Sequence, residues 1–472
     1  MQDNLTDTLS ISNPYFVVKK NGVEVHYDGK TKEFTDGVDC FKCEALELLL
    51  IQKENGIEVI NYSFETLYEI EIQYIQNISV TKEFLHIFQM PPASNIKGYV
   101  KEASMYYLIE IQRKSYNIGF SRRINGTPIS WPLTTIKNNI IGIIEGNGVT
   151  YYKYEEDKIC RTFSKENLIN TKSIDRDEFI GGKTIEFSPY DSGLVFGIFF
   201  PERNRFPGVI DLYRKEIGKP CKLINTISVL NGTSVLFNWC KKGHILLATT
   251  STDFDETGHN YYGTSMLHCL YISENSNSNV IESKLDKTLY KTPTNNVFTQ
   301  TLIQTQVQDV SFDPTGNFLG ILYGTQPSKL VIFDTSNMNQ IFSIQSCFFN
   351  TISFSYNSQF LAIAGFGNLP GDVEIYDTKD FKRVCKFASQ CTTEWTWSND
   401  NASIICGHCL PRRHFDNRIE RFGIDGRKIE RRDVLVKHIT MFGIPSTKDV
   451  VFKYIEYNEE NEIFKVAKKR VN

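Results

Sequence analysis

Residues 352–377 read ISFSYNSQFLAIAGFGNLPGDVEIYD, and the order of residue types in this stretch decides the fold class. Two short hydrophobic runs flank a polar turn, a glycine-rich loop follows, and a third run ends in an aromatic residue and Asp377. The same layout recurs earlier as VSFDPTGNFLGILYGTQPSKLVIFD, which ends at Asp334. Short alternating runs between turn residues are typical of strands. The stretch is therefore one unit of a strand repeat, which predicts a β-propeller.

A series of anchor residues extends this repeat along the chain. Each anchor is a large hydrophobic residue near the end of a strand that precedes a turn. The intervals from Phe312 to Phe354 and from Phe354 to Trp397 are 42 and 43 residues, the length of one propeller blade. Nine anchors predict an all-β fold, a single propeller of nine blades with four antiparallel strands each. The anchors are Phe41, Val80, Trp131, Phe187, Trp239, Phe312, Phe354, Trp397 and Met441.

The domain organisation follows from the need to close the ring. An open blade edge would leave backbone groups unpaired, so a strand from elsewhere must complete the last blade. Residues 15–27 have strand character outside the anchor series, and we expect them to fill this place. We expect residues 1–13 to be a flexible N-terminus, residues 14–466 to form the propeller and residues 467–472 to be a basic tail stub.

The composition is that of a globular protein and excludes several classes. Hydrophobic residues make up 41% and charged residues 23% of the 472 residues. The net charge of −3 does not favour nucleic acid, so any RNA contact needs a local basic patch. The polar start lacks the pattern of a signal peptide, and no run reaches the roughly 18 apolar residues of a membrane span. Eleven irregularly spaced cysteines suit a reducing compartment. We expect a cytoplasmic monomer without a membrane partner.

Two motifs suggest chemistry at first sight. Asp253-Phe-Asp255-Glu-Thr257 matches the DxDxT of aspartyl-nucleophile phosphatases, but that chemistry needs a parallel strand in a doubly wound sheet, and no such pattern is present. As a calcium loop it lacks the bidentate Glu. We therefore expect a structured loop. The pairs Cys406/Cys409 and Cys40/Cys43 resemble redox motifs, but they follow or lie in strand patterns and not at a helix N-terminus, so we expect buried cysteines.

The loop AGFGN is not a phosphate-binding loop, because no helix and no Gly-Lys-Ser/Thr motif follow it. Gly365 and Gly367 instead predict a tight loop with positive φ. No Ser/His/Asp constellation and no pair of spaced histidines is present. We therefore expect a protein that is not an enzyme and has no cofactor or metal.

The basic segment from Pro411 to Arg432 is the best candidate for a contact surface. Residues 406–438 hold nine Lys/Arg and five Asp/Glu. Arginine binds phosphate bidentately, and the interleaved Phe415 and Phe422 either stack on bases or belong to the blade core. In the alternative, Arg and Glu alternate along a solvated strand face. The candidate RNA- or ribosome-binding residues are Arg412, Arg413, Arg418, Arg421, Arg427, Lys428, Arg431 and Arg432, with a smaller patch at Arg113, Lys114, Arg122 and Arg123.

Three stretches resemble the eukaryotic translation initiation factor 2A family. Residues 251–263 (STDFDETGHNYYG) are similar to its STDxDxTGxxYYG loop, residues 364–377 to its AGFGNLxG…ExWD segment, and residues 409–417 to its CxPRxRxxN turn. In that turn His414 replaces the second Arg, whereas Arg413 and Arg418 are added nearby. The likeness is strongest over residues 231–426. Its signature residues are Asp253, Asp255, Gly258, Tyr261, Tyr262, Gly263, Gly365, Phe366, Gly367, Asn368 and Pro411.

The resemblance implies a nine-bladed, non-catalytic initiation factor. Its implied partners are the small ribosomal subunit, through rRNA and ribosomal proteins, and methionyl initiator tRNA, which it helps to deliver independently of GTP and dependent on the start codon. Messenger RNA and other initiation factors are further implied partners. Family members usually continue into a basic, helical C-terminal extension, whereas this chain ends at residue 472. We therefore expect docking through the propeller more than autonomous binding of tRNA or mRNA.

Two other classes of function stay open. One is a general propeller scaffold in a multi-subunit complex, similar to the propeller subunit of initiation factor three. The other is an enzyme that uses Asp253 and Asp255.

Overall fold

The computed structural model describes most of the chain. Nearly all regular structure in it is β-strand, and the helical exception within the described ranges is one 3-10 turn, η1 (Glu44–Leu46). None of these residues forms a helix long and apolar enough to cross a membrane. The described residues are 13–91, 104–124, 132, 134–137, 140–145, 148–155, 158–167, 184–189, 194–202, 207–216, 221–229, 232–252, 265–272, 297–303, 305–412 and 414–452.

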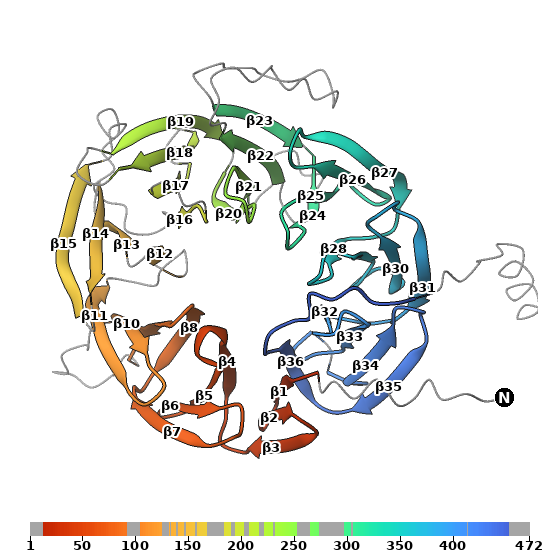
Figure 1. The fold of residues 1–472 in the computed structure, drawn as a ribbon, viewed down its shortest axis with the longest axis horizontal. Helices are drawn as coiled ribbons and strands as arrows, with labels where there is room; N and C mark the ends of the chain where they lie inside the picture. Colours follow the sequence, from red (N-terminus) through yellow and green to blue (C-terminus); the bar gives the residue numbers. More distant parts are fainter. Residues whose placement is uncertain are drawn as a thin grey trace, which may run out of the picture.

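The strands form nine antiparallel sheets of four strands, arranged as the blades of a ring (Figure 1). Blade one consists of β4 (Asp39–Cys43), β5 (Leu48–Lys53), β6 (Gly56–Asn61) and β7 (Thr66–Glu71), and blade two of β8 (Ile75–Thr81), β9 (Phe84–Gln89), β10 (Ser104–Ile111) and β11 (Tyr116–Ile124). Blade three consists of β12 (Thr134–Lys137), β13 (Ile140–Glu145), β14 (Gly148–Glu155) and β15 (Lys158–Asn167). Blade four consists of β16 (Thr184–Phe187), β17 (Leu194–Phe200), β18 (Gly208–Lys215) and β19 (Lys222–Val229).

Blade five consists of β20 (Ser234–Trp239), β21 (Ile245–Ser251), β22 (Ser265–Ile272) and β23 (Val297–Ile303), and blade six of β24 (Val307–Phe312), β25 (Phe318–Tyr323), β26 (Ser328–Asp334) and β27 (Asn339–Cys347). Blade seven consists of β28 (Thr351–Phe354), β29 (Phe360–Ala364), β30 (Asp372–Asp377) and β31 (Arg383–Ala388). Blade eight consists of β32 (Glu394–Trp397), β33 (Ser403–Gly407), β34 (Arg418–Gly423) and β35 (Lys428–Asp433). The predicted fold class, an all-β propeller of nine four-stranded blades, is thereby confirmed.

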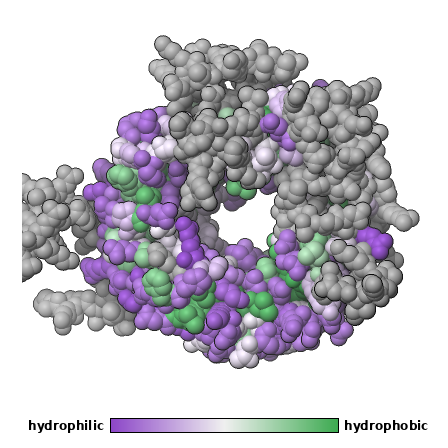
Figure 2. All heavy atoms as spheres, turned by 180° about the vertical axis from the view of Figure 1, so that it is seen from behind, coloured by the Kyte–Doolittle hydropathy of each residue, from purple (hydrophilic) through white to green (hydrophobic). Residues whose placement is uncertain are grey.

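The anchor residues mark the strand of each blade that lies nearest the centre of the ring (Figure 1). Trp131 lies outside the described residues, three positions before β12. The other eight lie on β4, β8, β16, β20, β24, β28, β32 and β36. Seen from behind, the ring surrounds a central opening (Figure 2).

The ninth blade closes the ring with strands from both ends of the described chain. Its strands lie in the order β36 (Val436–Met441), β1 (Tyr15–Lys19), β2 (Gly22–Tyr27) and β3 (Lys30–Phe34). The antiparallel pairing of β1 with β36 places Tyr15 opposite Met441 and Val18 opposite His438. Residues 15–27 therefore supply two strands of the closing blade.

Neighbouring blades are also joined through the turns between their first and second strands. Each turn hydrogen-bonds to the equivalent turn or segment of the next blade, so this set of bonds runs over six successive blades. The bonds are Ser188 Oγ to Gly243 O (2.9 Å), Cys240 Sγ to Gly316 O (3.5 Å), the Thr315 amide to Ser358 Oγ (3.3 Å), the Asn357 amide to Asn401 Oδ1 (3.3 Å) and Asn401 Nδ2 to Ser446 O (2.7 Å).

An ion pair crosses the seam between the eighth blade and the closing blade. Arg432 on β35 donates from Nη2 to Glu24 Oε2 on β2 at 2.8 Å, and Lys19 lies 3.0 Å from the same carboxylate. The Glu24 side chain is only 5% exposed. Burial alone would raise the pKa of Glu24, but the hydrogen bonds from Arg432 and Lys19 outweigh it and lower the pKa to about 2. The seam thus depends on a buried, ionised carboxylate.

We predict that Arg432→Leu destabilises the ring by about 2 kcal/mol, because it leaves the buried Glu24 carboxylate with a weaker set of partners. The urea midpoint of unfolding measures this effect. Arg431→Leu is the matched control, since Arg431 lies on the same strand but pairs with the exposed Asp416 and Asp433. Exposed pairs contribute at most about 1 kcal/mol. Equal losses in the two variants would contradict a structural role of the seam.

Candidate RNA-binding face

The alternation of strand direction gives the ring two chemically different faces. Loops between second and third strands, and the connections between blades, lie on one face, whereas the turns between first and second and between third and fourth strands lie on the other. We call these the motif face and the turn face. Residues 365–371 join β29 to β30 and residues 408–417 join β33 to β34, so two signature loops lie on the motif face of adjacent blades.

The third signature stretch cannot be placed in the same way. Residues 253–264 lie outside the described residues, although they join β21 to β22 in sequence. The predictions for Asp253, Asp255, Gly258, Tyr261, Tyr262 and Gly263 therefore remain predictions.

The two described signature loops meet at Gly367. The guanidinium group of Arg412 lies against this glycine, because a Cβ placed there would be 2.6 Å from Arg412 Nη2. Gly367 also has φ +74°, a conformation that other residues adopt only with strain. The sequence-based prediction of positive φ is therefore confirmed for Gly367.

The same prediction is wrong for Gly365, which is not among the described residues with positive φ. Glycine is needed at position 365 because the backbone of Phe348 passes close to it, and a Cβ there would overlap the carbonyl oxygen of Phe348. The neighbouring Phe366 is buried and packs edge-on against Trp395, with ring centroids 5.5 Å apart. Asn350 holds this loop by accepting from the Phe366 amide and donating to its carbonyl, both at 3.0 Å.

Exposed groups of complementary chemistry lie on these loops. Phe415 is 73% exposed and Phe348, in the connection from β27 to β28, is 57% exposed. Arg412 and Asn368 are exposed as well. We name Phe348, Asn368, Arg412 and Phe415 the motif surface. Guanidinium groups bind phosphates and exposed aromatic rings stack on bases, so this set offers both kinds of contact to RNA.

Phe348 was missed by the sequence analysis, and the signal for it was weak. It precedes Phe349, which is buried, so two adjacent phenylalanines point in opposite directions. Phe422, in contrast, belongs to the blade core: it is 3% exposed and stacks on Phe387 with centroids 4.4 Å apart. Of the two interleaved phenylalanines in the basic segment, only Phe415 is available for a partner.

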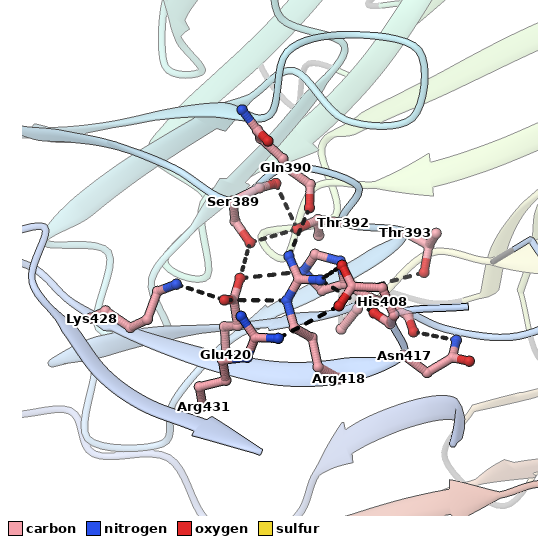
Figure 3. Close-up of polar contacts among 12 residues, drawn as sticks. Ser389, Gln390, Thr392, Thr393, His408, Asn417, Arg418, Glu420, Lys428 and Arg431 are labelled. Atoms are coloured by element: carbon pink, nitrogen blue, oxygen red, sulfur yellow. Dashed lines mark hydrogen bonds and ion pairs between the residues drawn. The ribbon is translucent and has the colours of Figure 1, made fainter. Parts of the chain in front are cut away.

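A buried ionic cluster lies at the two ends of the loop 408–417 (Figure 3). The Glu420 side chain on β34 is 2% exposed. It accepts hydrogen bonds from Lys428 Nζ at 2.7 Å and Ser389 Oγ at 3.1 Å, and its carboxylate lies 3.3 Å from both Arg418 Nε and His408 Nε2. This cluster joins β33, β34 and β35 to the connection that follows β31.

The cluster fixes both ends of the loop 408–417. Arg418 donates from Nη1 to the carbonyl oxygen of Asp416 at 3.3 Å and contacts the Asp416 carboxylate, while its Nη2 donates to Gln390 O at 3.5 Å. Asn417 Nδ2 donates to His408 O at 2.8 Å, and the Cys409 amide donates to Thr393 Oγ1 at 2.8 Å. Arg418 therefore positions the loop and is not free for a phosphate.

The charge state of the cluster follows from its contacts. Burial alone would raise the pKa of Glu420, but the hydrogen bond from Lys428, the charge of Arg418 and the hydrogen bond from Ser389 together lower the pKa to about 2. Burial lowers the pKa of His408, and the charge of Arg418 lowers this pKa further. The cluster is thus a carboxylate held by two cations.

The other basic residues of the segment are dispersed over the blade. Arg421 donates from Nε to Ser403 Oγ at 2.7 Å and lies 3.4 Å from Asp400. Arg432 belongs to the seam with Glu24. Arg427 is 83% exposed and lies in the turn between β34 and β35, hence on the turn face, opposite Arg412.

Two exposed cations of the outer strand β35, Lys428 and Arg431, pair with Glu420 and with Asp416 and Asp433. Such pairing agrees with the alternative to an RNA-binding surface, in which Arg and Glu alternate along a solvated strand face. Arg413 and the side chain of Arg122 lie outside the described residues, while Arg123 is exposed on β11, three blades away along the ring. The structure therefore brings Arg412, not the whole basic segment, to the motif surface.

The cysteine pairs are structural, as predicted. Cys40, Cys43, Cys406 and Cys409 are free and buried. Burial raises the pKa of both Cys406 and Cys409 to about 12, so these thiols stay protonated at neutral pH. A protonated buried thiol is a poor nucleophile, which argues against redox exchange.

Comparison with known proteins confirms the family resemblance. Residues 228–440 match the family model described as eukaryotic translation initiation factor eIF2A. The chain is 27% identical over 255 residues to eukaryotic translation initiation factor 2A of Dictyostelium discoideum, which is 53% of this chain and 38% of that protein. It is 29% identical over 229 residues to the Saccharomyces cerevisiae protein of the same name, 48% of this chain and 33% of that protein. The matches thus span 38% and 33% of the length of these relatives.

A solved structure shares the fold over nearly the whole ring. It is described as the crystal structure of the eukaryotic initiation factor, with a TM-score of 0.67 over 90% of this chain and 97% of that chain. The sequence identity is 17%, so this likeness establishes the fold alone.

We predict that the buried Glu420 makes stability depend on pH. Because its pKa falls from the ordinary 4.5 to about 2, the stabilisation is complete above pH 4.5 and is lost as pH falls toward 2. Glu420→Gln should cost about 2 kcal/mol at pH 7, and its difference from the wild type should shrink below pH 4.5. Urea unfolding at pH 7, 4 and 3 tests this.

The control for this experiment is Glu430→Gln, an exposed carboxylate on β35, which should change stability by less than about 0.5 kcal/mol at every pH. A difference between Glu420→Gln and wild type that stays constant down to pH 3 would contradict the assignment.

Proposed function

We propose that this chain, as a relative of translation initiation factor 2A over residues 228–440, is the propeller through which such a factor binds the small ribosomal subunit. The observation that carries the proposal is the contact of Arg412 with Gly367, which unites two signature loops from adjacent blades. That contact leaves an exposed guanidinium group with two exposed phenylalanines on the same face.

The motif surface suits ribosomal RNA better than the other basic residues do. A fully ion-paired arginine must give up a carboxylate before it binds a phosphate, and this applies to Arg418 and Arg432. Within the described part of the chain, Arg412 forms no ion pair. Its guanidinium group lies against Gly367 of the neighbouring loop. The net charge of −3 does not favour RNA as a whole, so the proposed contact is local.

The finer part of the proposal rests on the family resemblance. It is a non-catalytic role in GTP-independent, start-codon-dependent delivery of methionyl initiator tRNA, in the cytoplasm and as a monomer. Ribosomal proteins, messenger RNA and other initiation factors are the further partners. The relatives that support it are named translation initiation factors, and this chain matches about a third of their length.

A second candidate is a protein-interaction scaffold. The observation that favours it is the internal pairing of Arg418, Arg421, Arg431 and Arg432 with carboxylates, which leaves the eighth blade with few available cations. In this case the motif surface would bind a protein through Phe348 and Phe415.

We predict that Arg412→Glu weakens co-sedimentation with small ribosomal subunits about tenfold, because it replaces a phosphate ligand by a carboxylate. A salt series should also show the slope of log affinity against log salt falling by about one in magnitude. Phe415→Ala should weaken binding at all salt concentrations alike, since stacking is not ionic.

Arg427→Glu is the charge-matched control on the turn face and should bind as the wild type does. Binding unchanged by Arg412→Glu, or reduced equally by Arg427→Glu, would overturn the assignment of the motif surface. Binding that is sensitive to Phe415→Ala alone and insensitive to salt would favour the protein scaffold.

A further inference from the structure

A cavity of about 290 Å³ lies on the turn face, where the closing blade meets both neighbouring blades. Its lining comes from six places in the sequence: the residue before β1, the end of β2, the turn between β4 and β5, the turn after β6, the turn between β32 and β33, and the segment after β36. The side chains that matter are Tyr27, Glu44, Glu47, Tyr62, Asp400 and Ile444. The cavity therefore exists only in the closed ring.

Aromatic rings form one wall of this cavity. The rings of Tyr27 and Tyr62 have centroids 5.4 Å apart, and Tyr62 lies 4.8 Å from Phe442, which is fully buried. Burial raises the pKa of Tyr62 to about 12, so its phenol is neutral at physiological pH. The faces of such rings attract cations that approach within about 6 Å of their centroids.

Carboxylates also line the cavity. Three acidic residues, Glu44, Glu47 and Asp400, line the cavity, and no Lys or Arg stands among its lining residues in the described part of the chain. Asp400 is fixed by Asn13 Nδ2 at 2.7 Å and by Arg421 at 3.4 Å. The lining of the cavity thus combines neutral aromatic rings with three carboxylates, whose cationic partners lie outside the lining.

The two glutamates are able to change partners. Glu44 pairs with Lys42 at 2.6 Å and Glu47 with Arg113 at 3.5 Å. The side chains of all four residues are 37% to 67% exposed. Exposed pairs contribute at most about 1 kcal/mol, so an incoming cation can replace Lys42 or Arg113 at little cost.

We propose that this cavity binds a lysine or arginine side chain of a basic peptide segment in a protein partner. The carboxylates repel phosphate and so exclude RNA, and the volume is at the small end for ligand sites, which fits a side chain better than a nucleotide. Ile444, 83% exposed at the cavity, offers an apolar contact to the residue next to the cation. This feature favours a peptide over a free amine.

The proposal is independent of the motif surface, because the cavity lies on the opposite face. The ring can therefore hold RNA on the motif face and a basic protein segment on the turn face at the same time. Failure of one proposal leaves the other in place.

The test is fluorescence anisotropy of the full chain with a labelled peptide of five Gly-Lys repeats, and with five Gly-Gln repeats as the neutral probe. We expect binding of the lysine peptide only. Glu44→Gln with Glu47→Gln should weaken it at least tenfold, and Tyr27→Leu at least threefold through loss of the cation–π contact. Arg412→Glu should leave this binding unchanged, which separates it from the proposed RNA contact.

The matched control is Glu54→Gln with Glu71→Gln. Both residues are exposed and lie at the motif-face end of the same blade, so the double variant has the same net charge change without touching the cavity. An equal loss in this control would reduce the binding to non-specific charge attraction and overturn the proposal. Absence of binding by the wild type, or equal binding of the neutral peptide, would overturn it as well.

Discussion

Closure of the ring is the constraint on which the rest of the structure depends. The pairing of β1 with β36 gives the last blade its inner strand, and the Glu24–Arg432 ion pair secures the seam beside it. Hydrogen bonds between successive turns connect the blades along much of the ring. A blade out of place would thus displace its neighbours, and both candidate sites need neighbouring blades in register.

The fold was largely accessible from the sequence, because a blade repeats and its inner strand ends in a large hydrophobic side chain. Local pattern therefore located the first strand of eight of the nine described blades. The candidate site was only partly accessible. Arg432 finds its partner Glu24 408 positions away, and no local pattern shows such a pair. Gly365 illustrates the same limit, since its neighbour Phe348 belongs to another connection.

The two faces of the ring carry opposite chemistry although they share a blade. In the eighth blade, Arg412 reaches the motif face while Asp400 lines the acidic cavity of the turn face. The buried Glu420 pairs with Arg418 and Lys428, while Arg421, Arg431 and Arg432 pair with other carboxylates. The positive charge that a count over residues 406–438 suggests is therefore mostly paired with carboxylates of the same chain, and Arg412 is the described exception on the motif face.

The contact between Arg412 and Gly367 has an evolutionary consequence. A side chain at position 367 would occupy the space of the guanidinium group, so Arg412 would have to swing away and the contact between the two loops would be lost. A related chain with a small residue in place of Arg412 could carry asparagine at position 367, which tolerates positive φ, whereas a chain that keeps the contact needs glycine there. If residues 367 and 412, which are 45 positions apart in sequence, change together among related chains, this correlation would reflect the contact between the two blades.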